Sequence, residues 1–150
     1  MLDNVVMLQS RPSIRLAPAI GDMLDAVMDD ALELLRPAVD RQANNVSLEH
    51  IADEIRQGQS VLWLVYLGGE MKAALTTCVV NHEKRATLKI EFMGGAHMAY
   101  WMDYVVSQLA GLAKTAGLSA IEADGRKGFE KFVGNSAFRP VYTHYEMELS

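Results

Sequence analysis

The chain has 150 residues, half of them hydrophobic, which predicts a single domain with its own core. Its formal net charge is -5 and it has no run of Lys or Arg, which argues against nucleic-acid binding. The single cysteine, Cys78, excludes an intramolecular disulfide, and the longest apolar stretch, residues 61–67, is too short to span a bilayer. We therefore expect a cytoplasmic domain, residues 1–150, that does not enter the membrane.

The first third of the chain predicts a strand followed by two helices. A short apolar run at residues 5–8 predicts the strand. Apolar residues at helical spacing over residues 20–36 predict an amphipathic helix, and Pro37 should end or kink it. Residues 40–45 are polar and predict a loop, after which Ser47 can cap a second helix.

Three strands follow, and their order predicts an antiparallel meander. They cover residues 60–67, 71–80 and 87–93, with Gly68 and Gly69 forming the first hairpin turn. In the last strand, alternation predicts one face made of Leu88, Ile90 and Phe92 and an opposite face made of Lys89, Glu91 and Met93.

The remaining chain predicts a helix, a strand, a short helix and a final strand. The main helix begins near Met98 and closes at Gly117. The strand at residues 118–123 should lie parallel to the last meander strand, because the connection between them is a helical crossover. A short helix at residues 127–133 and a strand within residues 138–149 complete the chain.

The joint between the last meander strand and the main helix contains two glycines. Gly94 and Gly95 lead through Ala96 and His97 into the helix. Unpaired N–H groups and the helix dipole make such a joint suitable for an anion, and His97 could contact phosphate or act as a base near neutral pH. The alternative is a tight turn that holds no ligand, with His97 exposed to solvent.

Methionines surround this joint. Met93, Met98 and Met102 could line an adaptable binding surface, or they could fill the core at helical spacing. The four histidines have no ligand spacing such as H-E-x-x-H, so no metal site is expected.

The order of elements resembles that of the GNAT (Gcn5-related N-acetyltransferase) superfamily over nearly the whole chain. The sequence GRKGFEKF at residues 125–132, followed by GNSAF at residues 134–138, is similar to the closing Y-E-K-x-G-F region of that family. It also looks like a G-R-x-G-[WF] segment found in small GNAT-like proteins of tailed phages. The resemblance implies an α/β (α+β) fold, with a mixed, mostly antiparallel sheet of about six strands flanked by about four helices.

The resemblance also implies an acetyl-CoA site at the glycine joint. In the family, pantetheine pairs with the end of the third meander strand, here residues 92–94, and pyrophosphate lies on a Q/R-x-x-G-x-G/A loop. This chain has no Gln or Arg at the start of that loop. The residues implied as cofactor-binding are Phe92, Met93, Gly94, Gly95, Ala96, His97, Met98 and Ala99.

Catalytic residues are implied by the same resemblance. Family members often use a Glu on the meander strand as the base, and Glu91 holds that place. The usual acid is a Tyr at the position of Phe129, which cannot donate a proton, so Tyr142 and Tyr145 are the candidates to replace it. The alternatives are an ordinary strand carboxylate paired with Lys89 or a neighbouring strand, and tyrosines that only pack.

Two functions follow from these features. The first is acetyl-CoA-dependent N-acetylation of an amine on a small molecule or protein. The second is a non-catalytic GNAT-fold virion or accessory protein of a phage, with protein partners or self-association, which the incomplete loop and Phe129 favour. A dinucleotide-binding oxidoreductase is a distant third, since the joint lacks G-x-G-x-x-G.

Overall fold

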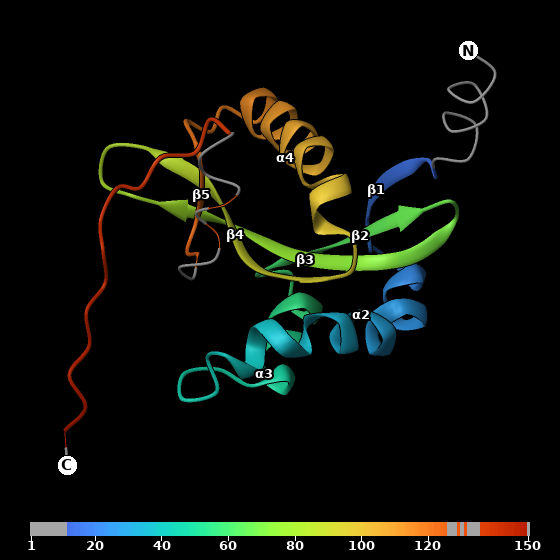
Figure 1. Cartoon of the computed structure of the whole chain (residues 1–150), viewed down its shortest axis with the longest axis horizontal. Helices are drawn as coiled ribbons and strands as arrows, with labels where there is room; N and C mark the ends of the chain where they lie inside the picture. Colours follow the sequence, from blue (N-terminus) through green and yellow to red (C-terminus); the bar gives the residue numbers. More distant parts are fainter. Residues whose placement is uncertain (1–11, 126–128, 130, 132–135, 150) are drawn as a thin grey trace.

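The computed structural model describes residues 12–125, 129, 131 and 136–149. Within them a five-stranded sheet of order β1-β2-β3-β4-β5 has helices on both faces (Figure 1). The strands are β1 (Ile14–Pro18), β2 (Val61–Leu67), β3 (Glu70–Asn81), β4 (Ala86–Gly95) and β5 (Ile121–Ala123). The helices are α2 (Asp22–Asp40), α3 (Leu48–Arg56) and α4 (Met98–Thr115). The first four strands are antiparallel and β5 is parallel to β4, which confirms the predicted mixed, mostly antiparallel class.

The first described strand was not predicted. β1 (Ile14–Pro18) pairs with β2 at one edge of the sheet, whereas the predicted strand at residues 5–8 lies outside the described residues. Pro18 ends β1, and an edge strand tolerates proline because one side of its ladder is unpaired.

Helix α2 continues through Pro37 to Asp40, so of the two outcomes predicted at Pro37, an end or a kink, the end does not occur. The last turn places Ala38 and Val39 in the core beside Leu35. Burial of these apolar side chains outweighs the one backbone hydrogen bond that proline removes. Helix α3 begins as predicted, with the Ser47 hydroxyl accepting from the backbone N–H of His50 at 3.2 Å.

The meander of β2, β3 and β4 forms as predicted, with Gly68 and Gly69 at positive φ in the first turn. One irregularity in β4 is important for the site. Thr76 pairs with Phe92 and Thr77 pairs with Ile90, so Glu91 is an extra residue that forms a β-bulge.

The bulge changes the face toward which β4 directs its side chains. Leu88 and Ile90 pack on the side of α4, whereas Phe92 packs on the side of α2 and α3. The prediction that all three share one face was therefore wrong, because one inserted residue shifts the alternation.

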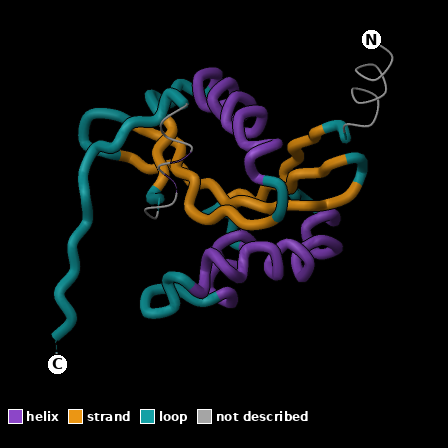
Figure 2. Tube along the Cα trace, viewed as in Figure 1, coloured by secondary structure: helices purple, strands orange, loops and turns teal. Residues whose placement is uncertain are grey.

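The sheet separates two cores, as Figure 2 shows by the helices on its two sides. One core lies beneath α2 and α3 and includes Met28, Leu35 and Leu64. The other lies beneath α4, where Trp101 and Val105 are fully buried. None of the helices in the described part of the chain has the length and apolarity needed to cross a bilayer.

The last predicted strand does not form. Residues 138–149 have no strand pairing, and they extend away from the body of the protein (Figures 1 and 2). The physical reason is that an alternating sequence forms a strand only where a neighbouring strand supplies the hydrogen bonds. The predicted helix at residues 127–133 lies mostly outside the described residues. Those residues thus hold five strands and three helices, against the six and four expected.

Candidate functional site

The two halves of β4 differ in what lies beside them. β5 pairs with Leu88, Lys89 and Ile90, and the pairing stops at the bulge. Beyond it, residues 92–95 pair with β3 on one side, and no described residue pairs with them on the other. This half of β4 therefore presents an open backbone edge, which is suitable for an extended ligand.

The two glycines at the end of this edge are required by the packing of the protein itself. A Cβ at Gly94 would overlap the backbone carbonyl of Leu34 in α2. A Cβ at Gly95, which has φ +135°, would overlap the backbone of Lys72 and Ala73 in β3. The turn interpretation thus explains both glycines without a ligand.

The joint nevertheless leaves donors free at the start of α4. The N–H of Ala96 donates to the carbonyl of Lys72 at 3.0 Å, and the N–H of Tyr100 donates to the carbonyl of His97 at 2.9 Å. Among the described residues, nothing accepts from the N–H groups of His97, Met98 or Ala99. His97 adopts a left-handed conformation with φ 61°, is exposed, and caps α4 without a side-chain hydrogen bond. Three free donors at a helix N-terminus favour an anion.

Glu91 lies half-buried on the α3 side of the sheet, where it belongs to a hydrogen-bonded cluster. The Ser60 hydroxyl donates to Glu91 Oε1 at 2.7 Å. Ser60 Oγ also lies 3.3 Å from Glu54 Oε2, and His50 Nε2 lies 2.6 Å from Glu54 Oε1. The sequence alone does not single out Ser60, Glu54 and His50, because no short motif links them to a residue on β4.

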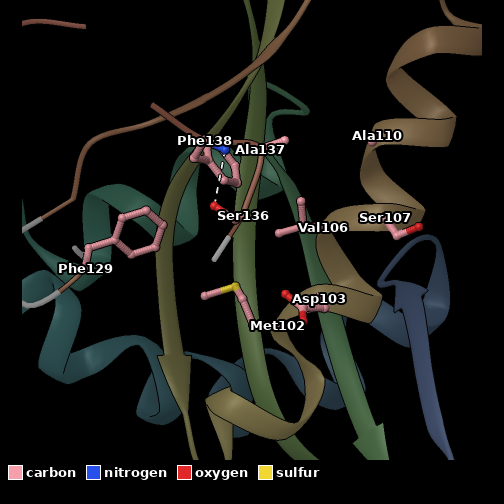
Figure 3. A pocket seen from close by; sticks show the side chains of 9 residues that line it. All are labelled: Met102, Asp103, Val106, Ser107, Ala110, Phe129, Ser136, Ala137 and Phe138. Atoms are coloured by element: carbon pink, nitrogen blue, oxygen red, sulfur yellow. Dashed lines mark hydrogen bonds between the residues drawn. The ribbon is translucent and has the colours of Figure 1, made fainter. Parts of the chain in front are cut away.

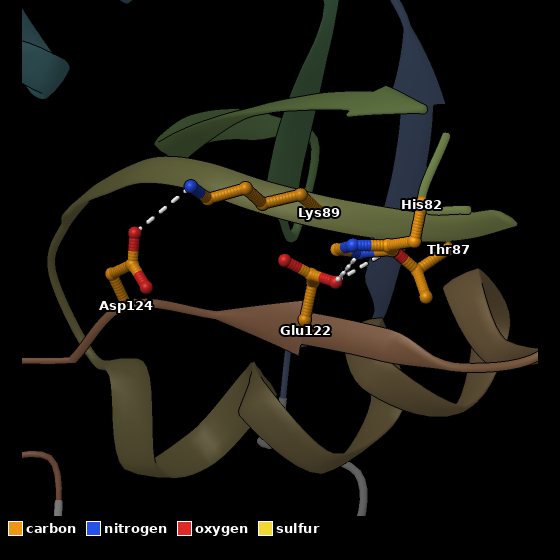
Figure 4. Close-up of polar contacts among 5 residues, drawn as sticks. All are labelled: His82, Thr87, Lys89, Glu122 and Asp124. Carbon is orange, nitrogen blue, oxygen red and sulfur yellow. Dashed lines mark hydrogen bonds and ion pairs between the residues drawn. The ribbon is translucent and has the colours of Figure 1, made fainter. Parts of the chain in front are cut away.

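The pairing of Glu91 with Lys89, which was part of the alternative to a catalytic role, does not form. Lys89 Nζ instead lies 2.9 Å from the carboxylate of Asp124, whose hydrogen bond raises the pKa of Lys89 (Figure 4). The Cys78 thiol lies beside Glu91, and burial, followed by the charge of Glu91, raises the pKa of Cys78 to about 11.

A second polar cluster joins β4 to β5, as Figure 4 shows. The Thr87 hydroxyl donates to Glu122 Oε2 at 2.7 Å, and His82 Nε2 lies 2.8 Å from the same oxygen. The Thr87 hydrogen bond, with a smaller contribution from His82, holds the pKa of Glu122 below its usual value. This cluster therefore joins the paired half of β4 to β5, and it does not include the residues of the open edge.

Two small cavities lined by described residues lie on opposite sides of the sheet. The cavity on the α3 side, of about 150 Å³, is lined by Glu91, Glu54 and Phe92 among others. The cavity on the α4 side, of about 200 Å³, lies between α4 and the segment after β5 (Figure 3). Its apolar lining includes Met102 and Phe138. The polar cavity, lined by Glu91 and Phe92, therefore adjoins the start of the open edge, whereas the apolar cavity is lined by α4 and by residues after β5.

The two candidate acids are not brought to this site. Tyr142 and Tyr145 are 77% and 87% exposed on the extended segment that leaves the body. Phe129 packs against the α4 core and lies edge-to-face with Phe138, with ring centroids 6.1 Å apart. Of the predicted methionines, Met93, Met98 and Met102 all pack on that core, as the core-filling alternative expected.

No protein-family model matches the sequence, and no curated protein matches it. Solved structures do match it in fold. An acetyltransferase of Trypanosoma brucei is 17% identical with a TM-score of 0.65, covering 91% of this chain and 100% of that one. An aminoglycoside acetyltransferase from an uncultured soil metagenomic sample is 14% identical with a TM-score of 0.66, covering 92% and 99%.

A predicted acetyltransferase of Clostridium acetobutylicum, solved with acetyl-CoA, is 11% identical with a TM-score of 0.62, covering 91% and 96%. The chain has the GNAT fold. In this GNAT fold, the described residues contain no group of three or more His, Cys, Asp or Glu side chains arranged to hold a metal ion.

Proposed function

We propose that the protein is an acyltransferase that moves the acetyl group of acetyl-CoA to an amine. The observation that carries this proposal is the edge of β4 beyond Glu91, which no described strand covers and which leads directly to three N–H groups at the start of α4 that have no acceptor among the described residues. A pantetheine arm is extended and forms amide hydrogen bonds, and a pyrophosphate is an anion, so one ligand would satisfy both features.

The proposed cofactor site uses the residues that the sequence implied, with one change. Pantetheine would pair with the backbone of residues 92–94, and phosphate would lie on the N–H groups of His97, Met98 and Ala99. Ala96 is not a donor to phosphate in this scheme, because its N–H already donates to Lys72. The apolar cavity on the α4 side would accept the rest of the cofactor.

The amine would occupy the cavity on the opposite face, where Glu91 can take its proton. The free amine then attacks the thioester carbonyl, whose developing negative charge a backbone N–H near Met93 stabilises. Collapse of this intermediate breaks the C–S bond, forms the amide and releases the thiolate of CoA, and the nitrogen gives its second proton to water. Neither Tyr142 nor Tyr145 lies within the site, so we assign protonation of the thiolate to water.

Titration calorimetry with acetyl-CoA tests the proposal. We expect a dissociation constant below millimolar, with release of free thiol when an amine acceptor is added. Glu91→Gln should keep the affinity for acetyl-CoA and lower kcat by on the order of a hundredfold. Glu83→Gln, in the exposed turn between β3 and β4, is the matched control and should change neither. A folded protein that does not bind millimolar acetyl-CoA would exclude the enzyme.

One observation favours a second candidate function, in which the domain binds another protein without catalysis. The segment at residues 138–149 exposes five apolar or aromatic side chains, of Val141, Tyr142, Tyr145, Met147 and Leu149. Exposed apolar patches of this kind mark protein contacts. The partner would be a second copy or a component of a larger assembly such as a virion. Sedimentation of the wild type against the double substitution Tyr145→Ser and Met147→Ser would detect self-association, which only the wild type should show.

A further inference from the structure

We propose that Ser60, Glu54 and His50 form a path that carries the proton taken up by Glu91 out to solvent. This inference rests on the proposed function, because Glu91 has a proton to release only if it accepts one from an amine. The three residues are positioning and proton-carrying groups, since none of them lies on the open edge where the thioester would bind.

The contacts form an unbroken chain of oxygen and nitrogen atoms. Ser60 Oγ lies 2.7 Å from Glu91 Oε1 and 3.3 Å from Glu54 Oε2. The other oxygen of Glu54, Oε1, lies 2.6 Å from His50 Nε2. The first and last contacts have the lengths of good hydrogen bonds, and the middle contact is the longest. Transfer between Ser60 and Glu54 is therefore the step that limits the path.

The path runs from the interior to the surface. Ser60 is 5% exposed, so bulk water does not reach its hydroxyl. The side chain of Glu54 is 24% exposed and that of His50 is 59% exposed. An imidazole has two nitrogens that can each bind or release a proton, which makes the largely exposed His50 a suitable exit.

A hydroxyl has one proton and can donate it to only one of two carboxylates. With Glu91 ionised, Ser60 donates to Glu91, which is the shorter contact. Once Glu91 carries a proton, the direction reverses, because Glu91 donates to Ser60 and Ser60 donates to Glu54. The cluster thus has two hydrogen-bonded arrangements that differ by the passage of one proton.

The proton balance of one turnover follows from these arrangements. The ammonium group loses a proton to Glu91 and becomes the attacking amine. Glu91 passes a proton to Ser60 Oγ as Ser60 gives its own to Glu54. At rest His50 donates its Nε2–H to the ionised Glu54, so His50 must first exchange protons with water until Nε2 carries a lone pair and Nδ1 carries the proton. After the carboxyl group of Glu54 turns, it passes its proton to Nε2, and the proton on Nδ1 leaves to water. All four side chains return to their starting states.

The other ionisable groups that face Glu91 do not offer a competing path. Cys78 approaches it from β3, but its raised pKa keeps the thiol protonated at neutral pH. Lys89 is the neighbour on β4, and its ammonium group is held by Asp124, which follows β5. From α3, Glu54 and its partner His50 are the ionisable groups that face this side.

The experiment is steady-state acetylation by the full chain at increasing concentrations of imidazole buffer. His50→Gln should lower kcat on the order of tenfold in weak buffer, and added imidazole should restore it. Ser60→Ala should lower kcat by a similar factor, and imidazole should not restore it, because the missing hydroxyl lies in a buried position that the buffer does not reach. Ser60→Thr keeps a hydroxyl and should keep activity. Asp53→Asn, exposed on the same helix, is the matched control.

The outcomes distinguish failure of the proposed proton path from failure of the proposed acetyltransferase function. If wild type acetylates an amine and both His50→Gln and Ser60→Ala retain its kcat and pH profile, the path is wrong and the proposed function stands. If wild type does not bind acetyl-CoA, the proposed function itself fails. Because His50 is largely exposed, its variant should fold, so the test does not depend on the tolerance of the buried Ser60 site to substitution.

Discussion

The two halves of β4 show how one strand can serve both stability and binding. From Leu88 to Ile90 the strand is paired on both sides, and the side chains of Thr87 and Lys89 bind Glu122 in β5 and Asp124 just after it. From Phe92 onward it is paired with β3 alone among the described residues. The bulge at Glu91 is the boundary, so the residue that breaks the register is also the carboxylate proposed to act on substrate.

The open half of β4 is supported by α2 packed on its face rather than by a neighbouring strand along its edge. Helix α2 packs so closely on it that Gly94 has no room for a Cβ, and β3 imposes the same limit on Gly95. Backbone contact with α2 thus replaces the missing neighbour strand. The edge can remain open to a ligand because its position is fixed by the face of the sheet.

The largest expected effect comes from breaking this support. Gly94→Ala places a Cβ against the carbonyl of Leu34, and relief requires movement of α2. We expect a loss of about 3 kcal/mol in the free energy of unfolding, measured by urea denaturation. Gly111→Ala, within α4 and with open space around it, is the control and should stabilise by roughly 0.5–1 kcal/mol. Equal effects of the two substitutions would mean that α2 does not support the open half.

The paired half is tested by Thr87→Val, which keeps the shape of the side chain and removes its hydroxyl. Glu122 loses its shortest hydrogen bond. We expect a loss of about 1 kcal/mol in the free energy of unfolding, below the range for a buried bond to a charged group, because the carboxylate is partly exposed to water. Thr115→Val, at the exposed end of α4, should change stability by less than about 0.5 kcal/mol.

The hydrogen bond between Thr87 and Glu122 also predicts that the stability of the folded protein depends on pH. The Thr87 hydroxyl lowers the pKa of Glu122 from its ordinary value of 4.5, so the folded state favours the ionised carboxylate. This stabilisation is fully present above pH 4.5 and is lost as the pH falls through the lowered pKa. Glu122→Gln should therefore cost about 0.5 kcal/mol at neutral pH and nothing in strong acid, as chemical denaturation at both pH values would show. A difference that persists in acid would contradict this origin.

The smallest expected effect is on the reactivity of the Cys78 thiol, which lies beside Glu91 at the boundary between the two halves of β4. Cys78 should react slowly with a thiol reagent at pH 7, since burial and the charge of Glu91 raise its pKa to about 11. Glu91→Gln removes that charge and should speed labelling a few fold at fixed pH, while Glu83→Gln should not. Unchanged labelling in Glu91→Gln would place the carboxylate farther from the thiol than the structure does.

Local pattern was enough to predict much of the fold. Alternation predicted the meander, helical spacing predicted α4, and the Ser47 cap predicted the start of α3. The extension of α2 through Pro37 could not be predicted, because it depends on the burial of Ala38 and Val39 against the sheet. Tertiary packing decided that boundary.

The site was less predictable, since pairing between distant segments creates it. The bulge at Glu91 exists only relative to Thr76 and Thr77, so no reading of β4 alone would reveal it. Ser60 precedes Glu91 by 31 residues and has no motif around it. The strand expected at residues 138–149 had the right alternation, but no described strand lies beside it.

Trp101 gives the protein a built-in optical reporter of its candidate site. Its ring is fully buried, and its Nε1 donates to the carbonyl of Ala96 at 2.8 Å, in the joint that leads into α4. The other tryptophan, Trp63, donates instead to Thr77 within the sheet. Any ligand that shifts the joint would alter the hydrogen bond of Trp101 and thus its fluorescence, so occupancy of the site can be followed without a label.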